Sequence, residues 1–195
     1  MLDTAVRRRL APTLDAVAAR SPVGAGALTA IGLALGLGAC VAAGLALWPL
    51  ALVLWLANRA LDGLDGAVAR RRGPTDLGGL LDFAADFVVY GGFLVGVAVA
   101  VPDARLACCA LLAAYLLNNV VLLSLASLLE KRRVAGGDER SLRFTPALTE
   151  GTETILVYAL LCLLPAQAEW IAWGFAALVL VSVGQRLVLA RRLLA

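Results

Sequence analysis

The chain has 195 residues, of which 62% are hydrophobic and 16% charged, with a formal net charge of +3 and no histidine. A soluble globular domain has about 45–50% apolar and about 25% charged residues. This composition therefore excludes a water-soluble monomer, and the absence of histidine excludes sites that depend on imidazole. The length allows at most about eight spans of about 20 residues. We expect an all-α, polytopic membrane protein.

The first predicted element is a short amphipathic helix that precedes the spans. Proline is common at the first position of a helix, so Pro12 predicts a helix over residues 12–20. Leu14, Val17 and Ala18 would lie on its membrane side, as in helices that lie flat in a bilayer surface. We therefore expect residues 1–21 to form an interfacial helix.

Six apolar stretches follow, and each is long enough to cross a bilayer. They run over residues 22–47, 49–70, 76–101, 104–129, 146–164 and 169–190. Glycines four residues apart, in the pairs Gly32–Gly36 and Gly92–Gly96, allow neighbouring helices to approach closely. We expect a single domain over residues 1–195, in which residues 22–195 form a six-helix bundle.

Basic residues concentrate at one end of the predicted spans. With six spans and an N-terminus inside the cell, the three short turns on the outer side contain a single basic residue, Arg105. Such an asymmetry marks the cytoplasmic side of a membrane protein. We expect a multi-pass protein of the cytoplasmic (inner) membrane, with both termini and the active site on the cytoplasmic side.

Four aspartates, Asp62, Asp65, Asp82 and Asp86, lie inside the second and third predicted spans. Each costs about 2.5–3.5 kcal/mol to insert near the middle of a span, so carboxylates in such places are functional by default. At about 100° per residue, the first two are about 60° apart on one helix and the last two about 40° apart on the next. Because a short turn joins the two helices, the pairs can meet at similar depth.

Converging carboxylates without histidine or cysteine form an all-oxygen site, which suits Mg²⁺, Mn²⁺ or Ca²⁺. Two such ions would neutralise the four carboxylates. Gly66 and Ala69 leave space beside the aspartates. Arg70 ends the helix with a guanidinium suited to bidentate phosphate contact. Together these features favour a diphosphate substrate bound through metal.

These residues resemble the signature of the CDP-alcohol phosphotransferase (CDP-alcohol phosphatidyltransferase) family, D-x2-D-G-x2-A-R followed by G-x3-D-x3-D. The matching positions are Asp62, Asp65, Gly66, Ala69, Arg70, Gly78, Asp82 and Asp86. The chain departs from the pattern at one place, because seven residues rather than the usual eight separate Arg70 from Gly78. The interfacial helix and the six spans also resemble the family's layout.

The resemblance implies an enzyme that transfers a phosphoalcohol group, here phosphatidyl, from a CDP-alcohol such as CDP-diacylglycerol to an acceptor hydroxyl. CMP is released, and the reaction belongs to phospholipid biosynthesis. Asp62, Asp65 and Asp82 would bind Mg²⁺ or Mn²⁺, and Asp86 would share in metal binding and act as general base. The CDP pocket would include Gly66, Ala69, Arg70 and Gly78. We expect two metal ions, membrane lipids among the partners, a homodimer as is common in the family, and no nucleic acid.

Two glutamates at the beginning of the fifth predicted span, Glu150 and Glu153, lie one helical turn apart. One interpretation is an acceptor-binding pocket for a cationic or polyol head group. The other is an ion pair or hydrogen bonds with Arg59, Arg186 or Asn118. The residues alone leave both interpretations open.

Two other functions are compatible with buried carboxylates: a metal-dependent membrane prenyltransferase and a divalent-cation transporter. The prenyltransferases carry their aspartate motifs far apart in a longer chain and lack the G-x2-A-R element. A transporter has no need of Arg70 beside the site. Release of CMP from a CDP-lipid separates the three functions.

Overall fold

The structure is a computed structural model, and it describes residues 2–132 and 151–194. Every regular element in these two ranges is a helix, which confirms the predicted all-α class. The α-helices are α1 (Leu2–Arg20), α2 (Ala25–Gly44), α3 (Trp48–Arg72), α4 (Asp76–Ala100), α5 (Arg105–Lys131), α6 (Gly151–Leu163) and α7 (Ala168–Leu194). Short 3₁₀ turns, Pro102–Ala104 and Pro165–Gln167, precede α5 and α7.

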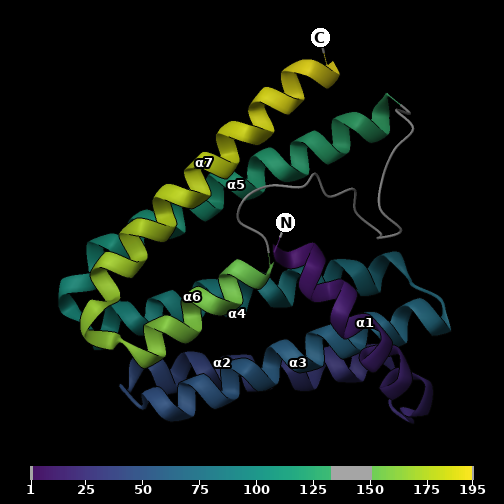
Figure 1. Ribbon diagram of the computed structural model, residues 1–195, viewed down its shortest axis with the longest axis horizontal. Coiled ribbons are helices and arrows are strands. Elements are labelled where there is room, and N and C mark those ends of the chain that lie inside the picture. The colour runs from purple at the N-terminus through teal and green to yellow at the C-terminus, as the bar shows by residue number, and fades with distance from the viewer. Residues whose placement is uncertain (1, 133–150, 195) are drawn as a thin grey trace.

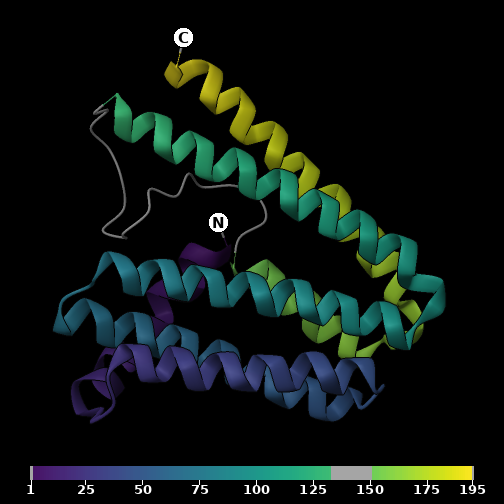
Figure 2. The same ribbon diagram turned by 180° about the vertical axis from the view of Figure 1, so that it is seen from behind.

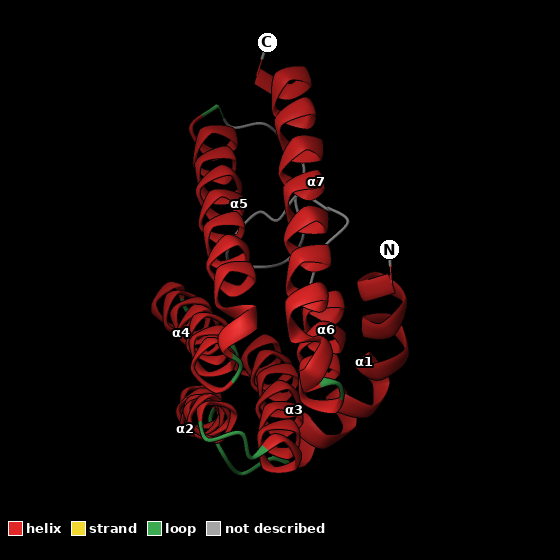
Figure 3. Ribbon diagram, turned by 90° about the vertical axis from the view of Figure 1, so that its left-hand side faces the viewer, coloured by secondary structure: helices red, strands yellow, loops and turns green. Residues whose placement is uncertain are grey.

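The helices form two groups (Figure 1). In the first group α2 packs against both α3 and α4, and successive helices run antiparallel. In the second group α5 and α7 pack against each other and lean away from α4, which the view from behind also shows (Figure 2). The end-on view shows α5 and α7 rising from the first group, with α1 and α6 beside α3 (Figure 3). The candidate site lies within the first group.

Several of these helices can cross a membrane. Among the described residues, the segments that are long and apolar enough are Ala25–Gly44, Asp76–Ala100, Pro102–Lys131 and Pro165–Leu194. α6 is a shorter apolar helix, and the preceding residues of its predicted span lie outside the described ranges. α3 has 25 residues but is more polar, since it carries Arg59, two aspartates and the terminal arginines. The number of six spans therefore stays a prediction.

The first helix differs from its prediction. α1 begins at Leu2, so Pro12 lies inside the helix and not at its first position. Leucine, alanine and arginine dominate the residues before Pro12, and these good helix formers extend the helix upstream. Ala18 is buried and, together with Leu14, packs on a small cluster that includes Val68 of α3. Part of the face predicted to contact the membrane thus attaches α1 to the bundle, whereas Val17 on the same face is 49% exposed.

Glycines set the distance between α2 and α4. A Cβ atom on Gly96 would lie 2.5 Å from the carbonyl oxygen of Cys40 and 3.1 Å from the amide nitrogen of Gly44, so backbone meets backbone there. A Cβ atom on Gly92 would lie 3.0 Å from the sulfur of Cys40. A Cβ atom on Gly36 of α2 would likewise clash with the side chain of Val89 on α4. The predicted close approach is confirmed at Gly36, Gly92 and Gly96, whereas a Cβ atom on Gly32 would make only an ordinary contact, 3.7 Å from Cβ of Leu61.

An aromatic cluster joins α3, α4 and α6 in the core. The ring centroid of Trp55 lies 4.8 Å from that of Tyr158 and 5.5 Å from that of Phe93. Nε1 of Trp55 donates a hydrogen bond to the carbonyl oxygen of Ile155 at 3.2 Å. The hydroxyl of Tyr158 donates to the carbonyl oxygen of Tyr90 at 3.0 Å. These rings and their hydrogen bonds fix α3 and α4 against α6.

The contact between α2 and α4 can be tested by adding a single methyl group. We expect Gly96→Ala to lower the free energy of unfolding by about 1–3 kcal/mol, because the new Cβ can be accommodated only if two backbones separate. Gly91→Ala on the same helix is the matched control, since the nearest atom to its Cβ would be 3.9 Å away. It should leave stability unchanged or raise it. Thermal unfolding in detergent measures both, and equal midpoints for the two variants would contradict the packing described here.

Candidate metal centre

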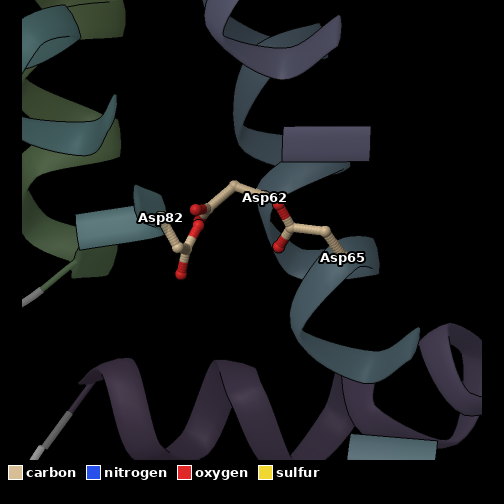
Figure 4. Close-up of side chains that lie close together, drawn as sticks. All are labelled: Asp62, Asp65 and Asp82. Carbon is tan, nitrogen blue, oxygen red and sulfur yellow. The ribbon is translucent and has the colours of Figure 1, made fainter. Parts of the chain in front are cut away.

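Three of the four aspartates come together between α3 and α4. One carboxylate oxygen from each of Asp62, Asp65 and Asp82 lies within 4.8 Å of the others. Figure 4 shows the three carboxylates turned toward one another, two from α3 and one from α4. The helical spacing and the short turn between the helices predict this meeting. We call these three residues the aspartate cluster.

Asp65 is the most deeply buried member of the aspartate cluster, with 3% of its surface exposed. Its Oδ2 atom accepts a hydrogen bond from the hydroxyl of Thr29 on α2 at 2.7 Å. Its Oδ1 atom is buried and has no hydrogen-bond partner in the described part of the chain. An unsatisfied buried carboxylate oxygen is costly, and a bound cation would remove that cost. Sequence reasoning missed Thr29, since no motif marks it.

The aspartate cluster fits a hard divalent cation. All of its donors are carboxylate oxygens, the ligands that Mg²⁺ and Mn²⁺ prefer. The free space among the surrounding side chains is about 10 Å³, close to what one water molecule requires. The unpartnered oxygen of Asp65 supplies an independent reason for a cation at this place.

The fourth aspartate, Asp86, lines the same small space but has a different partner. Its Oδ1 atom accepts a hydrogen bond from Nη2 of Arg59 at 2.7 Å. Nη1 of Arg59 also lies 3.6 Å from Oδ2 of Asp62. The sequence left Arg59 open as a partner for the glutamates, and the structure pairs it with two aspartates. Part of the negative charge of the site is thus neutralised by the protein itself.

The turn between α3 and α4 accommodates the one-residue departure from the signature. Gly73 has φ 101°, a conformation that glycine adopts readily, and it ends α3 directly after Arg72. Thr75 caps α4, because its Oγ1 atom accepts a hydrogen bond from the amide of Gly78 at 3.1 Å. The shorter connection therefore still brings Asp82 to the aspartates of α3.

The residues assigned to the CDP pocket lie on both sides of this turn. A Cβ atom on Gly66 would lie 3.4 Å from Nη1 of Arg70, so the missing side chain makes room for the guanidinium. Ala69 lies one residue before Arg70 on α3. A Cβ atom on Gly78 would lie 2.9 Å from Oγ1 of Thr75, which gives this glycine a role in the helix cap as well.

The two glutamates are placed only in part. Glu150 lies outside the described residues, and Glu153 lies half-buried in the first turn of α6. Two of the partners considered for them contact each other, since Nη1 of Arg186 donates a hydrogen bond to Oδ1 of Asn118 between α7 and α5. An acceptor-binding role for the glutamates stays a prediction.

Comparisons with known proteins show which family the chain matches and which fold it shares. The family model described as CDP-alcohol phosphatidyltransferase matches residues 23–183. The inner membrane protein YnjF of Escherichia coli is 40% identical over 172 residues, which cover 85% of this chain and 84% of that protein. A crystal structure of Mycobacterium tuberculosis phosphatidylinositol phosphate synthase (PgsA1) with CDP-DAG bound matches with a TM-score of 0.70 at 16% identity, over 93% of this chain and 94% of that chain. This last match shows a shared fold.

Metal binding can be measured without substrate. We expect the purified protein to bind Mn²⁺. Binding is measured by electron paramagnetic resonance, as the decrease of the signal of free Mn²⁺. Asp65→Asn should weaken Mn²⁺ binding at least about tenfold, because a charged ligand is lost. Thr29→Val should weaken it by about 10–100-fold, because the hydrogen bond that orients the carboxylate of Asp65 is lost. Asp103→Asn, in the turn before α5, is the matched control and should bind normally. Unchanged Mn²⁺ affinity in Asp65→Asn would show that the aspartate cluster is not the metal site.

Proposed function

The chain belongs to the CDP-alcohol phosphatidyltransferase family, and we propose that it transfers a phosphatidyl group from CDP-diacylglycerol to an acceptor hydroxyl, with release of CMP, in phospholipid biosynthesis. The observation that carries the proposal is the aspartate cluster, which the family's signature residues form beside Asp86. Family membership gives no support to the prenyltransferase or to the cation transporter.

The residues divide into those that hold metal and those that hold the nucleotide. Asp62, Asp65 and Asp82 would bind Mg²⁺ or Mn²⁺, and Asp86 would complete the site when two ions are bound. Divalent ions at such a site neutralise a diphosphate and the charge that develops on the leaving CMP. Arg70 would contact phosphate, and the positions without bulky side chains, Gly66, Ala69 and Gly78, would admit CMP.

Asp86 is the proposed general base. The acceptor oxygen forms a bond to the phosphorus of the phosphatidyl group while the bond from that phosphorus to the bridging oxygen breaks. CMP leaves with the bridging oxygen, and Asp86 takes the proton of the acceptor hydroxyl. A base needs only hydrogen-bond reach to that hydroxyl. Since Arg59 binds Oδ1 of Asp86, we assign proton acceptance to Oδ2.

The site is proposed to open on the cytoplasmic side of the inner membrane. α3, α5 and α7 alternate with antiparallel helices and so run in the same direction, and each has basic residues in its last turn. Positive charge at one end of the spans is typical of the cytoplasmic side. We further propose that residues 1–195 form one domain and that two copies form a homodimer.

The proposed reaction predicts metal-dependent release of CMP. Purified protein with CDP-diacylglycerol should release CMP when one member of a panel of polyol, amino-alcohol and phosphorylated-polyol acceptors is added. EDTA should abolish the release, and Mg²⁺ or Mn²⁺ should restore it. Nucleotide chromatography measures the CMP. Full activity in EDTA would exclude the metal mechanism, and no CMP with any acceptor would exclude the donor proposed here.

If the glutamates bind the acceptor, their replacement should change the KM for the acceptor and not the KM for CDP-diacylglycerol. With the acceptor found in that panel, Glu150→Gln and Glu153→Gln should raise its KM and leave the KM for CDP-diacylglycerol nearly unchanged, because uniform binding energy is lost. Glu169→Gln, in the first turn of α7, is the control. Lower thermal stability with unchanged kinetics would instead make the glutamates structural.

A further inference from the structure

Arg59 lies outside the family signature, yet it is built into the site. It precedes Asp62 by one helical turn, and only 5% of its side-chain surface is exposed. Nε donates a hydrogen bond to Oδ1 of Asn58 at 2.8 Å, Nη1 to the hydroxyl of Tyr90 at 2.8 Å, and Nη2 to Oδ1 of Asp86 at 2.7 Å. Every nitrogen of the guanidinium therefore has a partner.

The surroundings hold this guanidinium in one place. Its central carbon lies 5.0 Å from the ring centroid of Trp55 and 4.9 Å from that of Tyr90, within the range of cation–π attraction. The amide of Asn58 in turn donates a hydrogen bond to the carbonyl oxygen of Gly32 on α2 at 2.8 Å. Because the guanidinium is planar and rigid, its position relative to Asp86 is determined by direct contacts with α3 and α4 and by the contact of Asn58 with α2.

We propose that Arg59 is a positioning residue that holds the carboxylate of Asp86 in the orientation needed to accept the proton of the acceptor hydroxyl. The inference rests on the proposed function, in which Asp86 is the base. Asp86 is carried by α4, whereas Arg59 is carried by α3 with the first two members of the aspartate cluster. The hydrogen bond between them therefore fixes the base relative to the metal ligands across the helix interface.

A lysine at this position would keep the charge but not the geometry. An ammonium group is a compact point charge, and it cannot reproduce the planar array that contacts Asn58, Tyr90 and Asp86 together. A glutamine would lose the charge as well. Arg59→Lys and Arg59→Gln therefore separate the contribution of the charge from that of the fixed orientation.

The activity test combines these variants with the loss of the base. Arg59→Gln should lower kcat for CMP release by about 10–100-fold with little change in the KM for CDP-diacylglycerol, and Arg59→Lys should give an intermediate kcat. The double variant with both Asp86→Asn and Arg59→Gln should have the same kcat as Asp86→Asn alone, because Arg59 acts through Asp86. Independent, multiplicative losses in the double variant, or a normal kcat in Arg59→Gln, would overturn the proposal. Arg105→Gln, whose Nε donates to the carbonyl oxygen of Ala98 at the other end of α4, is the control.

Mn²⁺ binding supplies a readout that does not depend on turnover. Arg59→Gln should bind Mn²⁺ at least as tightly as the unmodified chain, since a positive charge 3.6 Å from Asp62 is removed. A lower kcat with intact Mn²⁺ binding is the expected pattern. Loss of Mn²⁺ binding together with kcat would mean that Arg59 supports the ligands of the aspartate cluster and does not act through Asp86 alone, and would overturn the proposal. If Arg59→Gln does not fold, Arg59→Lys takes its place in this measurement and in the activity test.

Failure of the proposed function can be distinguished from failure of this inference. If the unmodified chain releases no CMP, the function fails, and the contact is then tested by thermal unfolding alone. Arg59→Gln and Asp86→Asn should each lower the midpoint, and the double variant should unfold no lower than the less stable single variant. Additive losses would show that the two side chains are not coupled, and the positioning role would be excluded.

Discussion

Four carboxylates lie between α3 and the neighbouring helices, one of them buried and three half-buried, and they must be matched by positive charge. On insertion scales their combined cost is on the order of 10 kcal/mol if it is additive. Arg59 supplies one positive charge at 2.7 Å from Asp86 and 3.6 Å from Asp62, which leaves the aspartate cluster with excess negative charge. In the function we propose, a divalent cation bound by the cluster would supply what is missing, and the phosphates of the substrate would bind to that cation.

The helices around the site are arranged so that the carboxylates of the aspartate cluster lie side by side. Backbone contact at Gly96 brings α2 against α4, and the hydroxyl of Thr29 on α2 then reaches Asp65 on α3. The turn at Gly73 returns the chain so that Asp82 faces the same space. Each of these features is local, but together they leave little freedom in where the carboxylate oxygens lie.

The sequence predicts the features that depend on spacing along one helix or across one short turn. Asp62 and Asp65 share a face because they are three residues apart, and the short turn brings Asp82 to them. Contacts between distant helices depend on their relative rotation, which a single sequence does not show, so Thr29 was missed. Arg59 had a usable signal, since it precedes Asp62 by three residues and that spacing permits an ion pair on a helix. Pro12 misled the prediction of the first helix, because the helix formers before it outweigh its preference for the first turn.

We propose that a cation joins the carboxylates of α3 and α4, and an anomalous difference map from crystals grown with Mn²⁺ would locate it. We expect a peak bounded by Asp62, Asp65 and Asp82, with oxygen ligands from all three at roughly 2.0–2.6 Å. No peak at these residues, or an ion bound only at surface carboxylates, would contradict it.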